Sequence, residues 1–281
     1  MGEDSAKFLQ GQLTCDITSL PESQASLAAF CNPKGRVIST LLIVKTAKAF
    51  LLILPASLLD KVFKKLQIYI LRSSVRLSDQ NQSMQLLGLA CQTAIELNSC
   101  TEAFGLAGED ICIVKLPSPF SRYLAITPRP LPAEIANRQS SFNIGNAEEW
   151  RYQDVSSGFP WFEESQSELY IPQMLNVDGL GGISFNKGCY TGQEIIARTH
   201  YLGKTKRSLF LAECGVIDKS PDGGMAILDR ETRQNVGNIL SAQTFSQNTR
   251  LLLVLQAADA ESKNLVLDDA KRTAIKIVPT Q

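Results

Sequence analysis

The sequence predicts an α+β fold with two α/β sandwich units and a small C-terminal β-barrel. Near the N-terminus, several strand-like runs precede one amphipathic helix, which is typical of a sandwich rather than of alternating βα units. A looser copy of this pattern follows between residues 85 and 138. From about residue 206, short strands recur between Gly, Pro, Asn and Asp residues, a spacing that favours a small barrel. The length of 281 residues accommodates two or three domains.

The first unit begins with a short helix within residues 4–14, opened by Asp4 or Ser5, with its apolar side chains facing inward. Two β-rich runs on either side of the Asn-Pro-Lys-Gly turn at 32–35 predict a hairpin. A further strand is expected at 49–54.

An amphipathic helix is predicted over residues 57–72, followed by a strand at 75–80. The apolar positions of this helix repeat at i, i+3, i+4 and i+7, so that one stripe can pack against a sheet. These positions are Leu59, Val62, Phe63, Leu66 and Tyr69.

The second unit and the barrel are read from similar patterns. Strands are expected at 85–90, 110–117 and 122–128, with helices near 92–98 and 133–138. The expected barrel strands are 206–213, 224–229, 235–244, 249–256 and 273–278. We therefore divide the chain into regions 1–115, 116–205 and 206–281.

Composition excludes several classes of protein. The 28 basic and 28 acidic side chains give a formal net charge of zero, which argues against a strongly basic nucleic-acid binder. No apolar run approaches the ~18 residues of a membrane span. The first residues lack the basic and apolar stretches of a secretion signal. No membrane association is expected.

The seven cysteines form no CxxC pair, so a disulfide framework is not expected and a reducing cytoplasm is the predicted location. With His200 as the only histidine, a His-rich metal site is excluded, and no metal site is predicted. His200 falls at the end of a predicted helix, where it complements the helix dipole; we do not expect it to act as a base.

Residues 181–207 contain the pattern that points most directly to chemistry. Thr191 and Glu194 fit a capping box that opens a helix running to about Thr199. Cys189 lies just ahead of this helix, and Lys187 two residues earlier. A helix N-terminus and a nearby ammonium both favour a thiolate, so we single out Cys189 as a reactive cysteine assisted by Lys187.

Gly188 and Gly192 flank this cysteine and lack a Cβ, so a ligand or partner could approach the sulfur closely. A single cysteine is nevertheless more often a small buried hydrophobe than a nucleophile. The residues by themselves leave both interpretations open. The other six cysteines are interpreted as core residues.

The segment KGCYTGQE at 187–194 resembles the signature of the YgfZ family of folate-binding proteins, which are related to the aminomethyltransferase of glycine cleavage. Other parts of the chain resemble the same family: residues 8–16, 28–37, 158–160, 171–176 and 181–185, Gly203, Lys206 and Arg207.

The resemblance implies an aminomethyltransferase-like ring of three domains, two of them ferredoxin-like, and tetrahydrofolate or another folate as cofactor. It also implies a role in the assembly or repair of iron–sulfur enzymes, including tRNA-thiolating enzymes, which would be the partners. Cys189 matches the cysteine on which the family depends, and Trp150 matches a tryptophan that lies against folate. The remaining loop residues carried over from the family are Lys187, Gly188, Tyr190, Thr191, Gly192, Gln193 and Glu194.

Two departures from the family pattern weaken the expectation of tight folate binding. Family members usually have a strand ahead of residues 2–4 that supplies a second folate-contacting tryptophan, whereas this sequence starts at Met1. Related aminomethyltransferases have a glutamate, which can pair with the pterin, where this chain has Ser156.

Two alternative functions stay open: a folate-dependent aminomethyltransferase, and a non-catalytic regulator that senses folate. The chain resembles a transferase, but an accessory factor is the expected role, and the sequence does not settle whether it is an enzyme. The basic residues Lys204, Lys206 and Arg207 are interpreted as a solvated face, so no direct contact with nucleic acid is expected.

Overall fold

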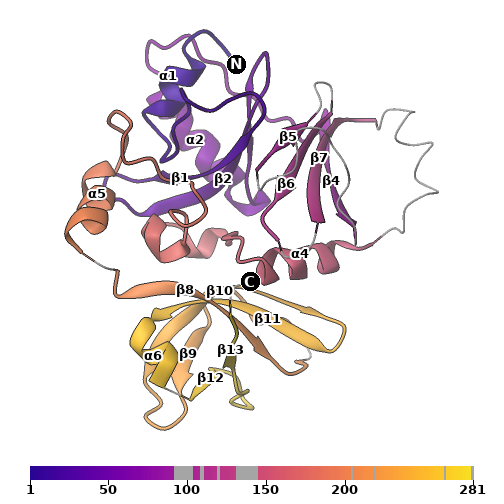
Figure 1. Ribbon diagram of the computed structural model, residues 1–281, viewed down its shortest axis with the longest axis vertical. Helices are drawn as coiled ribbons and strands as arrows, with labels where there is room; N and C mark the ends of the chain where they lie inside the picture. Colours follow the sequence, from indigo (N-terminus) through magenta and orange to yellow (C-terminus); the bar gives the residue numbers. More distant parts are fainter. Residues whose placement is uncertain are drawn as a thin grey trace.

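The computed structural model describes residues 1–91, 104–107, 111–118, 121–130, 145–203, 205–217, 219–262 and 264–279. Three antiparallel sheets organise these residues. The first two lie side by side in the upper half of Figure 1, and the third lies below them. The segment that follows α4 (Ala147–Ser156) passes between the upper and lower parts before it reaches α5 (Gln193–Leu202).

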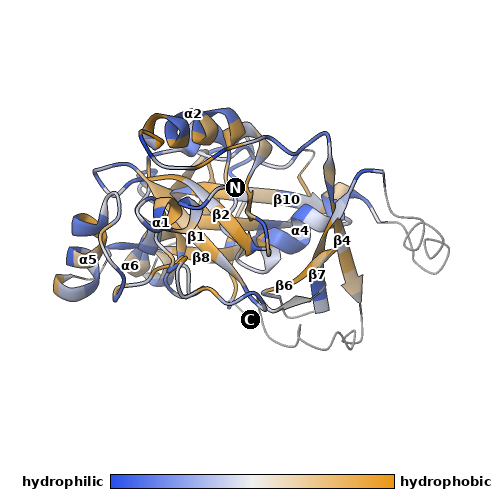
Figure 2. Cartoon of the chain, turned by 90° about the horizontal axis from the view of Figure 1, so that it is seen from above, coloured by the Kyte–Doolittle hydropathy of each residue, from blue (hydrophilic) through white to orange (hydrophobic). Residues whose placement is uncertain are grey.

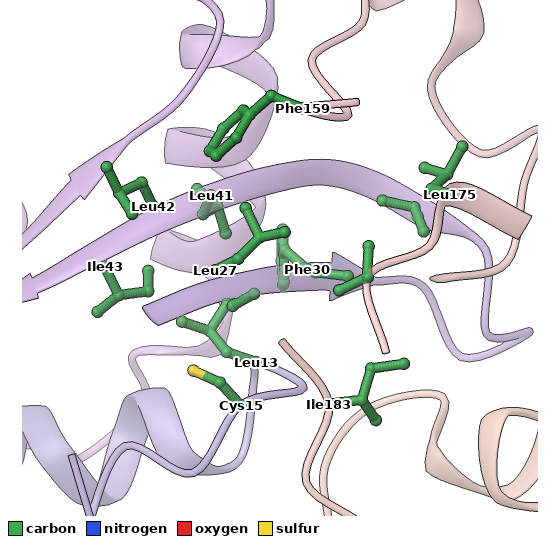
Figure 3. Packing of buried hydrophobic residues seen from close by; sticks show 14 of the residues in the cluster. Leu13, Cys15, Leu27, Phe30, Leu41, Leu42, Ile43, Phe159, Leu175 and Ile183 are labelled. Carbon is green, nitrogen blue, oxygen red and sulfur yellow. The ribbon is translucent and has the colours of Figure 1, made fainter. Parts of the chain in front are cut away.

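The first sheet is the most deeply buried part of the chain. Its strands are β1 (Ala25–Cys31), β2 (Val37–Lys45) and β3 (Phe50–Ile53), in that order. The strands β1 and β2 are apolar on both faces, as their colour in Figure 2 shows, and almost every residue in them is buried. Leu13, Phe159 and Leu175 pack against these two strands in Figure 3.

The two helices predicted in this region are found, but the second is shorter than the predicted 57–72. Tyr69, which was expected in its buried stripe, is exposed because it lies at the end of the helix. The first, α1 (Ser5–Gln10), buries Phe8 and Leu9 as predicted. A 3-10 turn, η1 (Ala56–Leu58), leads into α2 (Leu59–Tyr69), which buries Val62 and Leu66. The hairpin formed by β1 and β2 is also confirmed.

The strand predicted at 75–80 is not found. These residues pair with the start of the chain rather than with a sheet: Met1 N donates to Arg76 O (3.0 Å), and Arg76 N donates to Met1 O (2.8 Å). Asp4 N donates to Ser74 O at 3.4 Å. A strand requires a neighbouring strand as well as a suitable pattern, and the described residues offer this segment only these short contacts.

The second sheet has the order β4-β7-β6-β5. Its strands are β4 (Met84–Cys91), β5 (Leu106–Ala107), β6 (Cys112–Leu116) and β7 (Ser121–Pro128). The helices predicted near 92–98 and 133–138 lie outside the described residues. Asn146 caps α4 by accepting a hydrogen bond from Glu149 N (2.8 Å).

The third sheet has the order β12-β9-β10-β11-β8-β13. Residues 273–275 close it: Ile275 N donates to Leu265 O, Leu267 N donates to Thr273 O (both 2.9 Å), and the next residues pair with β8. The predicted barrel is thereby confirmed. Its strands are β8 (Arg207–Cys214), β9 (Ala226–Asp229), β10 (Asn235–Phe245), β11 (Asn248–Gln256), β12 (Leu265–Leu267) and β13 (Lys276–Ile277).

Two short elements of the barrel escaped sequence reasoning, the helix α6 (Ala257–Ser262) and the strand β12. Each is too short for a helical or alternating pattern to be recognised. Two 3-10 turns, η3 (Glu164–Gln166) and η4 (Pro172–Leu175), also occur between α4 and α5. None of the helices described in the structure is long and apolar enough to cross a membrane.

Candidate functional site

The loop of residues 184–192, which carries Cys189, is attached to the segment that follows α1. Ser184 N donates to Thr14 O (2.9 Å), and Thr191 N donates to Gly11 O (3.2 Å). Thr14 is itself fixed in the core, because its hydroxyl donates to Gly182 O and accepts from Ala29 N. Both ends of the loop are therefore held by backbone contacts to the first unit.

Lys187 supplies a third attachment. Its buried Nζ donates to Leu13 O (2.8 Å) and Cys15 O (2.7 Å), and it lies over the ring of Tyr190, 5.0 Å from the centroid. Burial lowers the pKa of Lys187 to about 8, although Cys15 and Asp16 act in the opposite direction. The side chain thus fixes the loop to residues 13–15.

This placement gives Lys187 a position different from the one expected. We predicted that it would favour a thiolate at Cys189, whereas its ammonium lies at the carbonyl group of Cys15. Burial raises the pKa of the Cys15 thiol to about 11, and the charge of Lys187 opposes this rise. Through these hydrogen bonds Lys187 helps to hold the loop that carries Cys189, and its predicted effect on the thiolate stays a prediction.

The predicted capping box is wrong. The helix α5 is capped by Gly192, whose φ of +83° is left-handed, and no side chain caps it. A Cβ at Gly192 would lie 2.7 Å from Asn32 O and 2.9 Å from Gly35 Cα, so the β1–β2 turn packs directly against this residue. Glu194 instead forms an exposed ion pair with Arg198 (3.3 Å).

The turn against which the loop packs is itself fixed by Asn32. Its Oδ1 accepts from Lys34 N (2.9 Å) and Arg36 N (3.0 Å), and its Nδ2 donates to Glu168 Oε2 (2.6 Å). This hydrogen bond, with a smaller contribution from Lys65, lowers the pKa of Glu168. Sequence reasoning missed Asn32 and Glu168. The Asn-Pro-Lys-Gly turn could have indicated Asn32, but no local pattern indicated its partner 136 residues away.

Cys189 is exposed. Gly188 beside it has open space where a Cβ would be, so a partner can reach the sulfur from that side. The other cysteines whose burial is described, Cys15, Cys31, Cys112 and Cys214, are all buried. Within the described ranges, no group of three or more Cys, His, Asp or Glu side chains could hold a metal ion. Among the described residues, Cys189 is thus an exposed thiol that belongs to no such group.

His200 lies in the last turn of α5, as predicted. Its ring stacks on Phe185, with 3.7 Å between the centroids, and meets Tyr201 edge-on. This stacking joins the far end of α5 to the start of the cysteine loop. The side chains of Tyr201 and Leu202 are exposed.

Trp150, the predicted folate contact, is partly buried between α4 and the second sheet. A Cβ at Gly88 would lie 2.3 Å from its ring, and the Arg122 guanidinium is 4.2 Å from the ring centroid. Gly88 and Arg122 lie on the same face of the sheet. The fully buried Arg122 also pairs with Asp154 (2.5 Å). Much of the indole is therefore used in packing α4 onto β4 and β7.

A small cavity of about 160 Å³ lies beside α4. Among the described residues, Ser156 Oγ and Gln153 Oε1 are buried without a hydrogen-bond partner, and both residues line this cavity. Glu149, Tyr152 and Phe245 complete much of its wall. A cavity of roughly 150 Å³ can hold a ring the size of benzene, so the site could accept one ring with a polar edge.

Comparison with known proteins agrees with this geometry. No family model matches the chain. A curated relative from Hamiltonella defensa, named tRNA-modifying protein YgfZ, is 35% identical over 252 residues, which are 86% of this chain and 74% of the relative. A relative of the same name from Yersinia enterocolitica is 33% identical over 286 residues, 96% of this chain and 85% of the relative.

A solved structure shows the same fold. The crystal structure of glycine cleavage system aminomethyltransferase T from Bartonella henselae superimposes with a TM-score of 0.73, covering 99% of this chain and 81% of that chain at 13% identity. The predicted aminomethyltransferase-like α+β fold is confirmed. This likeness establishes the fold. The chemistry has to be inferred from the residues of this chain.

Proposed function

The chain belongs to the YgfZ family of tRNA-modifying proteins, and from this premise we propose that it is a folate-binding factor that supports assembly or repair of iron–sulfur enzymes, tRNA-thiolating enzymes among them. The observation that carries the proposal is the exposed thiol of Cys189 on a loop fixed at both ends and at Lys187. A thiol held in this way meets a partner without prior reorganisation of the loop, which lowers the cost of association.

The chemistry open to Cys189 is limited by its surroundings. One sulfur cannot hold a cluster that needs four protein ligands, and among the described residues Cys189 belongs to no group of three or more possible metal ligands. Cys189 would therefore act as a transient ligand of a client's cluster, as the acceptor of the outer sulfur of a donor persulfide, whose inner sulfur leaves as a thiolate, or as the acceptor of a formyl or methyl unit from a substituted tetrahydrofolate, which takes up a proton and leaves as tetrahydrofolate. Each role uses the thiolate, whose proton passes to solvent.

Residues of α4 could contact one ring of a folate. Ser156 and Gln153 line a cavity of about 160 Å³, and each has a buried side-chain oxygen without a hydrogen-bond partner among the described residues. A polar edge of that ring could pair with these oxygens if their side chains turn toward the cavity. Trp150 retains a partly exposed indole on the adjoining face of the helix, a surface on which an aromatic ring can stack. When bound, folate supplies one-carbon chemistry. The residues of this chain would orient it through Ser156, Gln153 and Trp150.

The alternative of an aminomethyltransferase is less well supported. The hydroxyl of Ser156 stands where those enzymes place a carboxylate, and a hydroxyl does not carry the charge needed to pair with a protonated pterin. An accessory role, in which the thiol rather than a carboxylate does the work, agrees better with the residues present.

Complementation tests the proposed role of the thiol. In a strain that lacks this protein, Cys189→Ala is expected to abolish recovery of iron–sulfur enzyme activity and of tRNA thiolation while the protein stays folded. Cys112→Ala, which removes a buried thiol, serves as the matched control and should complement. Full rescue by a stably folded Cys189→Ala would refute the proposal.

A fluorescence titration tests the folate part separately. Binding of tetrahydrofolate should quench the emission of Trp150 and Trp161, and Trp150→Phe should remove most of the signal change. Ser156→Ala should weaken binding without altering the unfolding midpoint. If folate leaves the fluorescence of the unmodified chain unchanged and calorimetry detects no heat of binding, folate has no part in the function.

A further inference from the structure

One stripe of α4 converges on a single buried cation, the guanidinium of Arg122. Trp150, Asp154 and Ser157 are spaced i, i+4 and i+7, so their side chains lie on one side of the helix. The guanidinium carbon lies 4.2 Å from the centroid of the Trp150 ring, Nη2 donates to Asp154 Oδ1 (2.5 Å), and Nη1 donates to Ser157 Oγ (3.2 Å). The helix that carries the indole therefore also fixes the cation beneath it.

Gly88 of β4 allows the indole to lie close to the second sheet. A Cβ at Gly88 would be 2.3, 2.5 and 2.6 Å from three consecutive atoms of the six-membered ring of Trp150. Such similar distances to three neighbouring atoms place the glycine over the ring face rather than at its edge. Arg122 pairs with Ala90, two residues after Gly88, so Gly88 and Arg122 project from the same face of the sheet. Both cover the side of the ring that faces the sheet.

The pair of Arg122 and Asp154 is an expensive way to pack a helix. Arg122 is fully buried and Asp154 nearly so, and Arg122 Nε is buried without a partner among the described residues. Replacing a buried ion pair by apolar residues of similar volume is often neutral or stabilising. What the pair does provide is direction, because a planar guanidinium held through two of its nitrogens cannot turn and keeps the ring stacked on it in one plane.

The fixed indole is next to the cavity beside α4. Gln153 follows Trp150 by three residues, so the two side chains are neighbours on the helix surface, and Gln153 lines the cavity. The indole is itself only partly buried. A ring bound at the cavity would therefore lie close to an indole whose plane is already set.

We propose that Arg122 and Gly88 are positioning residues for folate: they hold the Trp150 indole against the second sheet, so that its other face is oriented for an aromatic ring of the ligand. The proposal rests on the proposed function, since it takes Trp150 as a folate contact, and it adds two residues from a different sheet. Aromatic stacking depends on the relative orientation of the rings, and an indole that needs no ordering lowers the cost of binding.

The role of the cation is tested by a paired substitution, Arg122→Met with Asp154→Leu, which leaves neither charge buried alone. In a Trp161→Phe background all tryptophan emission comes from Trp150. Without folate, quenching of this emission by acrylamide should rise in the paired variant, because the ring is no longer held. Calorimetry should show an affinity for tetrahydrofolate that falls by about tenfold, while the unfolding midpoint changes little.

Gly88→Ala is an independent test that removes no charge. The added carbon would meet the Trp150 ring and has to displace it, so quenching should again rise and folate affinity should fall. If the paired variant does not fold, Gly88→Ala decides the outcome.

Each variant has a matched control. Arg272→Met with Asp268→Leu removes an ion pair of the barrel, and Gly215→Ala places a carbon in open space. Neither control should alter the quenching of Trp150 or the affinity for folate.

Two results would overturn the proposal. One is unchanged quenching of Trp150 in the folded variants, which would show that the indole is held without Arg122 and Gly88. The other is an unchanged affinity for folate although quenching has risen. Failure of the proposed function looks different, because the unmodified chain would then bind no tetrahydrofolate, while increased quenching in the variants would still show that these residues hold the indole.

Discussion

The cysteine loop and an apolar groove differ in how many of their contacts come from the rest of the chain. The loop is held by hydrogen bonds to residues 11–15 and by packing against the turn at 32–35. The groove, of about 470 Å³, is lined by α1, β3, α2, β4 and residues 75–81. It leaves β3 half-buried and its outer edge without a strand among the described residues. The comparison indicates that the chain itself holds the loop in place, whereas the walls of the groove stay partly exposed.

The strongest test of a preformed loop is Gly192→Ala. The left-handed backbone costs a residue with a Cβ about 1–2 kcal/mol, and the added carbon would meet the main chain of Asn32 and Gly35. We expect a loss of about 3 kcal/mol in the free energy of unfolding, measured with urea. Gly188→Ala is the matched control, because open space surrounds its Cβ position. Equal effects of the two substitutions would show that the loop is not docked on the turn.

Lys187→Met removes the central attachment of the loop. The carbonyl groups of Leu13 and Cys15 would lose their donor while remaining largely buried, at a cost of about 2 kcal/mol. Chemical denaturation measures this cost, and Lys206→Met, at an exposed position, is the control. Alkylation of Cys189 should also change in rate for Lys187→Met alone. An unchanged stability would mean that the loop does not depend on this lysine.

The same lysine predicts a dependence of stability on pH. Burial lowers the pKa of Lys187 to about 8 in the folded state, from 10.5 for the free side chain. Between these values this lysine binds a proton in the unfolded chain but not in the folded chain, so its own contribution to stability rises with pH. From pH 8 to pH 9 this contribution should rise by about 1 kcal/mol, and a neutral amine still has two protons for the two carbonyl groups.

Lys187→Met should abolish this gain, as unfolding curves recorded at several pH values would show. Burial also raises the pKa of the Cys15, Cys31, Cys112 and Cys214 thiols, so the unfolded chain releases these protons first and their contribution to stability falls over the same range. The contribution of Lys187 is therefore the difference in stability between the unmodified chain and Lys187→Met. A difference that does not shift in favour of the unmodified chain by about 1 kcal/mol from pH 8 to pH 9 would contradict the assigned state of Lys187.

The smallest effect on stability is expected in the groove. Leu86, which lines the groove, is already half exposed, so Leu86→Glu should change the free energy of unfolding by less than about 0.5 kcal/mol. Thermal and urea unfolding would measure this difference. A loss of about 2 kcal/mol or more in the free energy of unfolding, as for a buried leucine, would mean that the groove is closed in solution. The contrast between an exposed groove and a fixed loop would then be wrong.

Local patterns predicted much of the architecture. The hairpin followed from two β-rich runs and a Pro/Gly turn, α2 followed from its apolar stripe, and the barrel followed from regularly spaced short strands. The hairpin and the strands β9, β10 and β11 pair neighbours in sequence, whereas β8 pairs with β11 and β13, an order that the spacing of the strands did not predict. The strand expected at 75–80 does not form. Its side chains alternate between half-buried and exposed as in a strand, but a strand also needs a partner strand, which no local pattern can predict.

The contacts that hold the cysteine loop could not be predicted from the sequence. The motif located Cys189 and its loop, whereas the positive φ of Gly192 arises from a turn near residue 35, far earlier in the chain. The direction of Lys187 is likewise set by carbonyl groups more than 170 residues away. The local sequence predicted a capping box at Thr191, whereas in the structure the N-cap of the helix is Gly192, which packs against the distant turn. The division into regions at 115 and 205, and the roles of Cys189 and Trp150, stay predictions.

The most direct test of the account is selective alkylation of the native protein with a maleimide reagent, followed by peptide mass spectrometry. The account predicts that Cys189 is modified well before Cys15, Cys31, Cys112 and Cys214, which are buried, and that Gly192→Ala alters the rate at Cys189 while Gly188→Ala leaves the loop docked. Modification of any of those four buried cysteines ahead of Cys189 in the folded chain would contradict a loop that presents this thiol to partners.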